Sequence, residues 1–544
     1  MSMMNAEDLQ RRFPDASEIP PEHRLASPIH QRTYLVGGEY RAWDGECKTV
    51  LSPICARQPD GTVRQLEIGS YPVMGEAQSD AALDAAVAAY DNGRGAWPTM
   101  TVAERIACMH DFVKRMVTER QRIVSLIMWE IAKSLADAQK EFDRTVEYIV
   151  ATIAALKELD NGSSRFEIAE GTIGQIRRTP LGVVLCMGPY NYPLNETFAT
   201  LIPALLMGNT VVFKPPQYGT LLFYPLLEAF RSAFPAGVIN TVYAPGAVVV
   251  PRMLATGRVN VLALIGSSKV ADHLKKQHPK SHRLRAILGL DAKNAAIVLP
   301  DADIELTVKE CLLGTLSFNG QRCTALKMLI VHRSIADMFL RRFTEELGKL
   351  KVGMPWEPGV AITPLPGLHR TTYMTEAIDD ARAQGARVIN EGGGTFCQTL
   401  FYPAVVYPVR EGMKLYREEQ FGPIIPVMPF DDLETALQYV ITSDHGQQVS
   451  IFGADPQQIG ALVDPLVNQV CRVNLNCQCQ RGPDVFPFAG RKDSAEGTLS
   501  VTDALRAFSI RSMVAAKQTD ASKTLLGAIV RDHRSKFINT DFIL

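Results

Sequence analysis

The chain has 544 residues, which at ~150 residues per domain is enough for roughly three or four domains or for two large ones. Lysine and arginine number 57 and aspartate and glutamate 58, so the formal net charge is -1, and hydrophobic residues make up 46%. This profile excludes a disordered chain, a collagen-like chain and a protein that binds nucleic acid or an anionic membrane through an overall basic charge. We therefore expect a globular protein whose partner is a small molecule.

Signals for export, for a membrane span and for a metal are missing. Residues 1–10 lack the basic start and apolar run of a secretory signal. The most apolar stretch, 198–213, is interrupted by Pro203 and is shorter than the ~20 residues that span a bilayer. The ten cysteines are scattered, and Cys477 and Cys479 have no second pair at zinc-ligand spacing. We expect a cytoplasmic protein without a disulfide framework and without a metal.

The first third of the chain changes character at Thr101. Residues 1–80 are rich in Pro, Gly and short β-branched runs, which predicts an irregular arm with a few strands. Thr101 and Glu104 form a capping box before apolar residues at helical spacing, so a long helix is expected to start there. A second helical run covers 133–159, and 171–176 predicts a strand that leaves the helical layer.

Short apolar runs then alternate with helical stretches, which is typical of βαβ units in a parallel sheet. The predicted elements are residues 183–187, 194–207, 211–213, 221–230, 238–243, 248–255 and 259–265. Ligands of such sheets bind beyond the carboxyl ends of the strands, so the informative loops are 188–191, 214–217 and 266–268. A second α/β pattern covers 296–488, and the apolar run 508–515 predicts an edge strand.

No Gly-x-Gly-x-x-Gly fingerprint follows any of these strands, so the usual dinucleotide signal is absent from the sequence. Gly266, Ser267 and Ser268 stand between a predicted strand and a predicted helix, where backbone N–H groups and the helix dipole suit a pyrophosphate. The alternative is an ordinary serine N-cap.

Cys323 follows Arg322 in the turn Asn-Gly-Gln-Arg-Cys-Thr-Ala, directly before an apolar run. A neighbouring cation and backbone amides can stabilise a thiolate, and a thiolate is a good nucleophile. A single cysteine is more often a buried apolar residue. The prediction of a nucleophile therefore depends on the other motifs.

Taken in order over residues 30–516, several motifs resemble the aldehyde dehydrogenase superfamily. They are Gly188-Pro-Tyr-Asn-Tyr-Pro, Lys214-Pro-Pro, Phe234-Pro-Ala-Gly-Val-Ile-Asn, Gly266-Ser, Gly320-Gln-Arg-Cys-Thr and Glu418-Glu-Gln-Phe-Gly-Pro. The chain is most similar to the non-phosphorylating, NADP-dependent glyceraldehyde-3-phosphate dehydrogenases, through Asn191-Tyr192, Arg322-Cys323 and residues 479–488. The resemblance implies an α/β fold with two parallel-sheet domains and a small β bridging element, and NAD(P)-dependent oxidation of an aldehyde.

The resemblance implies that Cys323 attacks the aldehyde carbon, while the Asn191 amide and the backbone N–H of Cys323 bind the oxyanion. The chemistry agrees, because a thiohemiacetal can expel hydride to a nicotinamide and its oxyanion needs donors. Judged from local sequence alone, Asn191 is as well explained as a turn residue between two prolines.

The resemblance also implies a set of cofactor residues: Lys214, Pro216, Gln217, Gly246, Gly266, Ser267, Glu419 and Phe421. Lys214 is expected to contact a ribose, and Glu419 with Phe421 is expected to position the nicotinamide ribose and ring. The alternative for Lys214 or Glu419 is a charged side chain exposed to solvent at the surface. NAD-preferring relatives often carry a carboxylate at the position of Gln217, which would repel a 2′-phosphate. We therefore expect NADP, with NAD as the alternative.

The substrate residues implied by the resemblance are Arg144, Tyr192, Arg322, Thr324 and Arg481. Converging guanidinium groups and a phenol hold a phosphate dianion well. The alternative for Arg144 is an exposed ion pair on its own helix. We expect a phosphorylated aldehyde as substrate and, from the resemblance, a place in glycolysis.

The general base of the family, the Glu of a Leu-Glu-Leu-Gly-Gly-Lys segment, is missing, because residues 288–293 read Leu-Gly-Leu-Asp-Ala-Lys and place Gly289 in its position. Asp291 lies two residues on and, in an extended segment, on the same face. Three hypotheses follow. In the first, Asp291 or a positioned water replaces the Glu, and the protein oxidises glyceraldehyde 3-phosphate to 3-phosphoglycerate. In the second, another acceptor such as coenzyme A takes the acyl group, or the substrate is another anionic aldehyde. In the third, the protein is a weak or inactive NADP-binding relative.

The domain organisation implied by the resemblance has three parts and a tail. The cofactor-binding domain comprises 1–165 and 181–288, the catalytic domain 289–497, and the bridging element 166–180 paired with 498–517. Exposed edge strands of that element are expected to join subunits into a homodimer or homotetramer. The tail, 518–544, lies outside the resemblance; its run 537–544 alternates weakly, which predicts another strand or packing against a neighbouring subunit.

Overall fold

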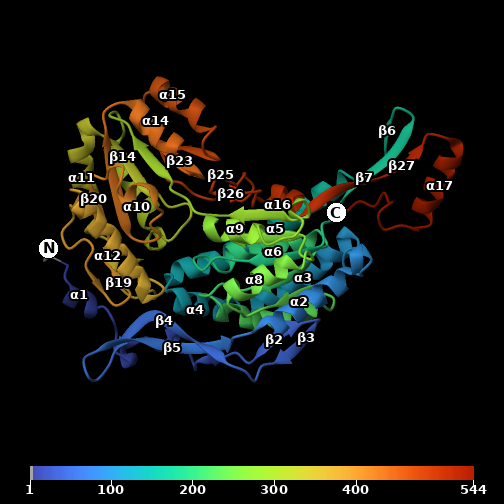
Figure 1. Cartoon of the computed structure of the whole chain (residues 1–544), viewed down its shortest axis with the longest axis horizontal. Coiled ribbons are helices and arrows are strands. Elements are labelled where there is room, and N and C mark those ends of the chain that lie inside the picture. Colours follow the sequence, from blue (N-terminus) through green and yellow to red (C-terminus); the bar gives the residue numbers. More distant parts are fainter. Residues whose placement is uncertain (1–3) are drawn as a thin grey trace.

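The computed structural model describes residues 4–544, in which two sheet-containing units stand side by side and a narrow arm projects from one of them (Figure 1). The N-terminal strands run along the lower edge of both units in this view. They are β1 (Ile29–His30), β2 (Thr33–Val36), β3 (Glu39–Ala42), β4 (Cys47–Arg57) and β5 (Val63–Pro72), preceded by α1 (Ala6–Gln10), η1 (Ala16–Glu18) and η2 (Pro21–His23). The strands form a β1-β5-β4 sheet and a β2–β3 hairpin, so the predicted irregular arm contains more regular structure than expected.

The first unit contains a six-stranded sheet in the order β10-β9-β8-β11-β12-β26. Its strands are β8 (Val183–Met187), β9 (Thr210–Lys214), β10 (Ile239–Thr241), β11 (Val261–Ile265), β12 (Arg285–Gly289) and β26 (Ala495–Glu496). The first five are parallel, as their alternation with helices predicts, and β26 pairs antiparallel with β12. The carboxyl ends of β8, β9, β11 and β12 therefore open toward one edge of this sheet.

Helices cover this first sheet and link it to the N-terminal strands. They are α2 (Glu76–Tyr90), η3 (Asp91–Gly93), α3 (Val102–Thr118), α4 (Arg120–Ile131), α5 (Leu135–Asn161), α6 (Asn195–Leu206), η4 (Leu221–Leu226), α7 (Leu227–Ala233), α8 (Gly246–Ala255), α9 (Ser268–Lys275), η5 (Ser281–Arg283) and α16 (Val501–Ala507). The capping box at α3 is present: the Thr101 hydroxyl accepts from the Glu104 N–H at 3.2 Å, and the Glu104 carboxylate accepts from the Thr101 N–H at 2.7 Å.

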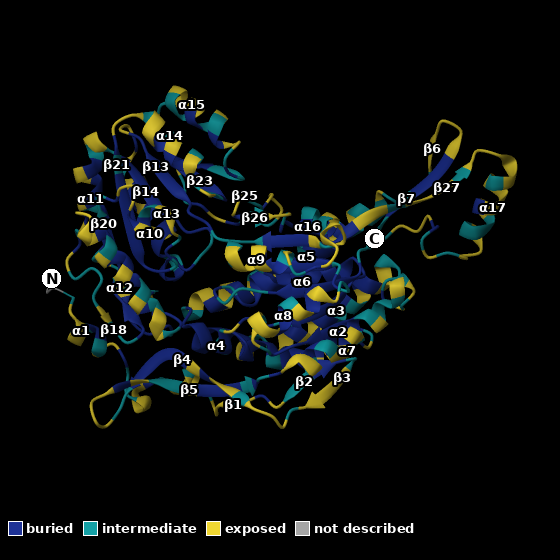
Figure 2. Cartoon of the chain, viewed as in Figure 1, coloured by how far each residue is buried: buried dark blue, intermediate teal, exposed yellow. Residues whose placement is uncertain are grey.

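The second unit contains a seven-stranded sheet in the order β17-β20-β21-β14-β13-β23-β24. Its elements are β13 (Ala295–Val298), α10 (Ile304–Leu316), η6 (Ser317–Gly320), β14 (Met328–His332), α11 (Arg333–Leu347), α12 (Leu368–Ala383), β17 (Arg387–Val388), β20 (Ala404–Tyr407), α13 (Lys414–Arg417), β21 (Ile424–Phe430), α14 (Leu433–Thr442), β23 (Gln448–Phe452), α15 (Pro456–Leu466) and β24 (Arg472–Leu475). The short pairs β15 (Lys351–Val352) with β16 (Val360–Ile362), β18 (Phe396–Cys397) with β19 (Leu400–Phe401), and β22 (His445–Gly446) with β25 (Arg491–Lys492) complete it. The central strands of both sheets are buried (Figure 2), which explains why they read as continuous apolar runs.

The arm consists of β6 (Glu167–Ala169), β7 (Thr172–Pro180), β27 (Ser509–Lys517) and α17 (Asp520–Arg531). Strand β27 pairs antiparallel with β7 along its whole length, which is the pairing expected between the two bridging segments. The other edge of β27 pairs with no strand among residues 4–544, and the side chains of Ile510 and Met513 on β27 are exposed.

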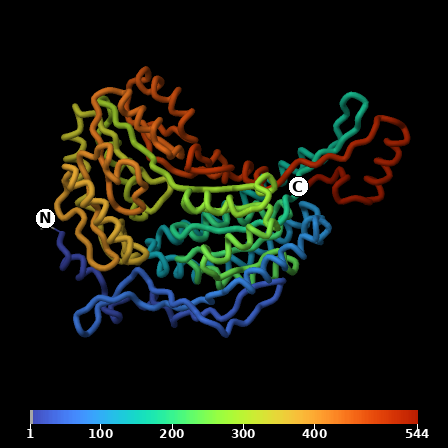
Figure 3. Tube along the Cα trace, in the orientation of Figure 1, coloured from blue at the N-terminus to red at the C-terminus, as the bar shows by residue number. Residues whose placement is uncertain are grey.

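The tail differs from the expectation of a further strand, because 537–544 forms none. The chain turns through α17 and returns, so that the C-terminus lies at the base of the arm (Figure 3). There the Lys157 ammonium donates to the Leu544 carbonyl at 2.7 Å, and the Asn161 side chain exchanges two hydrogen bonds of 2.8 Å with the Ile543 backbone. The weak alternation reflects packing on the chain's own α5 and β7, where Ile538 joins a small apolar cluster.

In residues 4–544 no helix is both long enough and apolar enough to cross a membrane. The same residues contain no group of three or more His, Cys, Asp or Glu side chains arranged to hold a metal ion.

A buried carboxylate on α4 holds the start of η4, and its removal is expected to destabilise the first unit. Glu130 accepts hydrogen bonds of 2.9 to 3.0 Å from the backbone N–H groups of Thr220, Leu221 and Leu222. Burial nevertheless raises the pKa of Glu130 to about 7. Glu130→Ala leaves these N–H groups without an acceptor, so we expect a loss of about 3 kcal/mol in the free energy of unfolding, measured by urea denaturation.

The exposed Glu147 on α5 supplies the control for this variant, because no ion pair or capping bond involves its side chain in the described part of the chain. Glu147→Ala is expected to change stability by less than ~0.5 kcal/mol. Equal stabilities of the two variants would contradict the structural role assigned to Glu130.

Candidate active site

Two loops from different units meet at the predicted nucleophile. Asn191 lies in the loop between β8 and α6, and its Nδ2 donates to the backbone oxygen of Gln321 at 2.8 Å. The neighbouring Tyr190 hydroxyl donates to the Gln321 side chain at 3.2 Å. Cys323 is two residues further on, so the structure attaches the predicted amide donor to the turn that carries the predicted thiol. A primary amide has two N–H groups, and one of them is free for a second acceptor.

Cys323 is half-buried, and its backbone oxygen accepts from Asn294 Nδ2 at 2.7 Å. Burial raises the pKa of Cys323 to about 11, with further increases from Glu196 and Glu419, while Arg481 and a hydrogen bond from Gln447 act in the opposite direction. The sequence predicted a thiolate stabilised by Arg322. In the structure the thiol is protonated at neutral pH, so its proton must leave as a carbon–sulfur bond forms.

The Arg322 side chain binds groups other than the Cys323 thiol, which explains why the predicted stabilisation of the thiolate is missing. Its Nη2 donates to the Gly314 carbonyl at 3.2 Å and to the Gln478 side chain at 3.1 Å. Its buried Nε has no hydrogen-bond partner, and no carboxylate in residues 4–544 forms an ion pair with it. Arg322 is therefore a cation whose charge is available to a ligand. Thr324, which follows the cysteine, is buried.

The other predicted substrate arginines are already paired with carboxylates. Arg144 binds Asp484 through two hydrogen bonds of 3.1 and 2.8 Å. Arg481 contacts the same Asp484 at 3.3 Å and forms a buried ion pair with Glu196. The structure thus brings Arg144 and Arg481 together as predicted, but with two counter-ions that were not predicted. An anionic ligand must compete with these carboxylates.

A buried lysine that the sequence did not single out fixes the Asn191 loop. Lys133 Nζ donates to the Asn191 backbone oxygen at 2.8 Å and to Glu141 at 2.5 Å, and it lies 3.4 Å from the ring centroid of Tyr192. Glu141 also accepts from the N–H groups of Leu194 and Asn195, at 3.0 and 3.2 Å, at the start of α6. Tyr192, predicted to bind substrate, is therefore engaged by a cation. The only feature of the sequence that pointed to this contact was the spacing of eight residues between Lys133 and Glu141, which carry opposite charges.

The predicted ribose lysine lies at the end of β9. Burial and the nearby Lys48 of β4 lower the pKa of Lys214 to about 8, and its Nζ donates to the Pro215 carbonyl at 3.2 Å. A Cβ built on Gly246, at the start of α8, would lie 3.4 Å from the Lys214 side chain, so these two predicted residues are adjacent. Gln217 is exposed, and Pro216 before it is buried. Lys48, missed by the sequence, adds a second positive charge here.

The start of α9 is capped from within. The Ser267 hydroxyl accepts from the Val270 N–H at 3.4 Å, as an ordinary serine cap does, and Gly266 stands between the end of β11 and this serine. Asp291 Oδ2 accepts from both the N–H and the hydroxyl of Ser268, each at 2.8 Å. The structure therefore places the Asp291 carboxylate at a helix N-terminus, where it occupies donors that a pyrophosphate would otherwise use.

Glu419 and Phe421 lie in the loop between α13 and β21, beside another buried lysine. Lys327 Nζ is 3.7 Å from Glu419 Oε1 and 4.5 Å from the Phe421 ring centroid. The Phe421 ring meets Tyr190 edge to face at 5.8 Å. Lys293 fixes the same loop by donating to the Glu418 carbonyl at 2.7 Å and to the Gln420 side chain at 2.5 Å. Each lysine stands just before a buried strand, β14 or β13, a pattern that was visible in the sequence.

The position of the missing general base is open in the structure. Gly289 is the last residue of β12, and a Cβ built on it would make ordinary contacts of 3.4 Å with Leu499 and 3.5 Å with Ile265. The backbone conformation at this position does not require glycine, and a Cβ would fit. The carboxylate of the family's general base is therefore not excluded here by lack of space for a Cβ.

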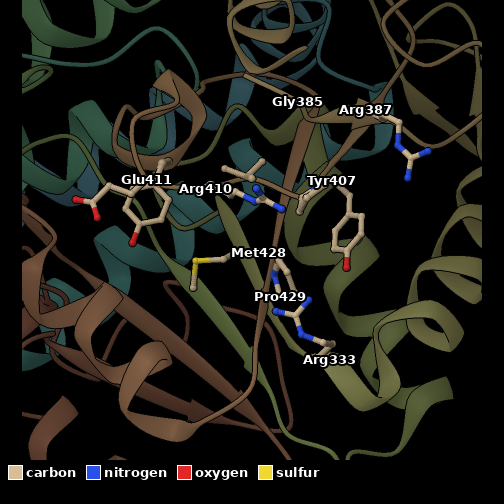
Figure 4. A pocket seen from close by; sticks show the side chains of 11 residues that line it. Arg333, Gly385, Arg387, Tyr407, Arg410, Glu411, Met428 and Pro429 are labelled. Atoms are coloured by element: carbon tan, nitrogen blue, oxygen red, sulfur yellow. The ribbon is translucent and has the colours of Figure 1, made fainter. Parts of the chain in front are cut away.

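A separate hollow of about 720 Å³ lies at the outer edge of the second sheet, between β17, β20 and β21 (Figure 4). It contains none of the predicted site residues. Of the arginines around it, Arg333 is paired with Asp431 at 2.8 Å, whereas Arg387 and Arg410 point in different directions in the close-up view. We therefore assign no part of the candidate active site to it.

Comparison with known proteins identifies a family model and several relatives. The model described as "Aldehyde dehydrogenase family" matches residues 60–514. An NADP-dependent glyceraldehyde-3-phosphate dehydrogenase of Streptococcus equinus is 33% identical over 462 residues, which cover 83% of this chain and 93% of that protein. A malonate-semialdehyde dehydrogenase of Oceanobacillus iheyensis is 30% identical over 471 residues, covering 84% and 95%. The crystal structure of NADP-dependent glyceraldehyde-3-phosphate dehydrogenase from Bacillus halodurans, complexed with NADP, has a TM-score of 0.81 at 29% identity and covers 90% of this chain and 100% of that one.

Proposed function

Since the chain belongs to the aldehyde dehydrogenase family and is an NAD(P)-dependent oxidoreductase acting on aldehydes, we propose that it oxidises glyceraldehyde 3-phosphate to 3-phosphoglycerate with NADP. The observation that carries this proposal is the hydrogen bond from the Asn191 amide to the turn that leads into Cys323. In the same turn, Arg322 carries a charge that no carboxylate in residues 4–544 compensates. The names of several relatives support the substrate and the cofactor, although a malonate-semialdehyde enzyme is also similar.

The oxidation proceeds on the Cys323 sulfur. Sγ adds to the aldehyde carbon as the thiol gives its proton to solvent water, and the second N–H of Asn191 with the backbone N–H of Cys323 bind the oxyanion. A bound NADP would supply the acceptor for the hydride that leaves when this adduct collapses. The product of the step is a thioester on Cys323, which a second acceptor must then release.

The residues at the cofactor site fit NADP. Lys214 and the nearby Lys48 provide positive charge, and the exposed Gln217 adds no negative charge that would repel a 2′-phosphate. Glu419 has a buried oxygen, Oε1, without a hydrogen-bond partner in the described residues, which suits a sugar hydroxyl. Asp291 at the start of α9 is the element least suited to a dinucleotide, because it occupies the helix N-terminus.

A prediction at Arg322 tests the charge of the substrate. We expect Arg322→Leu to raise KM for glyceraldehyde 3-phosphate ~10- to 100-fold, which corresponds to ~1.5–3 kcal/mol for hydrogen bonds to a charged group. The KM for propionaldehyde, which has no phosphate, should change by less than ~2-fold. Arg410→Leu, in the separate hollow of Figure 4, is the matched control. An equal rise in KM for both aldehydes would show that Arg322 does not bind the phosphate.

The fate of the thioester defines a second candidate function. Gly289 provides no carboxylate, and both bonds that Asp291 makes are directed to Ser268. Transfer of the acyl group to coenzyme A is therefore the alternative to hydrolysis. A stopped-flow assay with glyceraldehyde 3-phosphate, with NADP or NAD, and with or without coenzyme A separates the candidates. Unchanged turnover on adding coenzyme A excludes acyl transfer, and an NADPH burst equal to the active sites excludes an inactive relative.

We further propose a cytoplasmic homodimer or homotetramer that is held together through the arm. The free edge of β27 and its exposed Ile510 and Met513 support pairing with a second copy, because an unpaired apolar edge associates readily. Sizing chromatography with light scattering tests this, and a monomer would contradict it.

A further inference from the structure

The carboxylates around Cys323 differ in what they bind. Glu196 and Glu419 are the acidic groups that act electrostatically on the thiol. Glu196 is committed to a buried ion pair with Arg481. Asp291 Oδ2 accepts two hydrogen bonds from Ser268. Of these three carboxylates, Glu419 alone has a buried oxygen with no hydrogen-bond partner among residues 4–544.

Glu419 lies beside Lys327, which is too far from Oε1 to form a hydrogen bond with it. Lys327 Nζ is 3.7 Å from Oε1, while it donates to the carbonyls of Gly320 at 2.7 Å and Gln420 at 3.0 Å. These bonds attach the Glu419 loop to the turn that leads into Cys323. The Glu419 side chain is 11% exposed, and its Oε1 is buried. A carboxylate in this situation can accept a proton from a bound water.

We propose that Glu419 is the general base for hydrolysis of the Cys323 thioester in this protein, in place of the glutamate that Gly289 replaces. This rests on the thioester chemistry proposed above. A water oxygen bonds to the acyl carbon while one of its protons passes to Glu419. The carbon–sulfur bond then breaks with its electron pair on Sγ, and Glu419 returns the proton to the thiolate. The products are a carboxylic acid and the Cys323 thiol, so atoms and charge balance.

The electrostatics of the site suit this role near neutral pH. Burial raises the pKa of Glu419 to about 7, and Asp291 raises it further. Lys327, a hydrogen bond from the Ala292 backbone and Lys293 act in the opposite direction on this pKa. The other titratable groups that face Glu419 are Cys323, Tyr190 and Tyr373. A base must be deprotonated, so the rate of thioester hydrolysis should rise with pH and level off above about 7.

An activated ester tests the proposal without glyceraldehyde 3-phosphate and without NADP. p-Nitrophenyl acetate acylates Cys323 in a burst of p-nitrophenolate, and the slower phase then reports hydrolysis of the acetyl-enzyme. We expect Glu419→Gln to keep the burst, to lower the slow phase by ~10²-fold or more, and to remove its rise between pH 6 and 8. A role limited to binding NADP would leave this assay unchanged, because no cofactor is present.

Two further variants make the result decisive. Glu418→Gln, at the exposed neighbouring position, should behave as the unmodified protein. Gly289→Glu combined with Glu419→Gln should recover the slow phase, since a Cβ fits at Gly289. Hydrolysis at the unmodified rate with an unchanged pH profile in Glu419→Gln would overturn the proposal, and so would an equal loss of burst and slow phase. If glyceraldehyde 3-phosphate proves not to be the substrate, this assay can still be read, because it does not use that aldehyde. If the unmodified protein shows no burst, the proposal of a thioester on Cys323 is refuted.

Discussion

Cys323→Ala is expected to lower the rate of NADPH formation ~10⁴-fold or more, because no other group in the site can form the covalent adduct from which hydride leaves. Single-turnover stopped-flow absorbance with glyceraldehyde 3-phosphate and NADP measures this rate. NADP binding, followed by quenching of tryptophan fluorescence, should be retained, since the predicted cofactor residues lie on other elements.

Cys477→Ala is the matched control, because Cys477 is also a free, half-buried thiol but lies beyond β24. Its NADPH formation should equal that of the unmodified protein. If Cys477→Ala lost activity and Cys323→Ala kept it, the assignment of the nucleophile to Cys323 would be wrong.

Asn191→Ala is expected to lower the rate of hydride transfer ~10²- to 10³-fold, which is the usual effect of removing one oxyanion donor. The effect should fall on kcat and not on KM, because the donor acts on charge that develops only during the reaction. The same variant removes the bond of 2.8 Å to the Gln321 carbonyl, which joins the two loops. Presteady-state kinetics of the NADPH burst measures the change.

A nearby asparagine distinguishes this role from a structural one. Asn195, at the start of α6, is also buried, but its side chain donates to the Thr145 hydroxyl at 3.3 Å on α5. Asn195→Ala should affect thermal stability more than the burst rate. Equal burst rates in Asn191→Ala and the unmodified protein would remove Asn191 from the oxyanion site.

Much of the fold could be predicted because local signals and tertiary packing agree. The capping box at Thr101 begins α3, and the apolar run that ends at Met187 forms β8 with the predicted bounds. The family was confirmed by the match over residues 60–514. The tail was the weakest region, because α17 and the packing of 537–544 depend on contacts with α5 and β7 that no local pattern encodes.

The electrostatics of the candidate site could not be predicted from the sequence. The sequence placed Cys323 beside a cation and predicted a stabilised thiolate, whereas burial and two carboxylates raise its pKa. One of these carboxylates, Glu196, lies on α6 and is far in sequence from its partner Arg481. Such pairs depend on which side chains the fold brings together, and a single sequence contains no record of them.

The central claim is that Cys323 carries the acyl group after hydride has left. Peptide mass spectrometry of enzyme that is acid-quenched during turnover with glyceraldehyde 3-phosphate and NADP tests it most directly. We predict a phosphoglyceroyl adduct on the peptide that contains Cys323, in an amount that increases in Glu419→Gln. NADPH formation without an adduct at Cys323, or with the adduct on another cysteine, would contradict the claim.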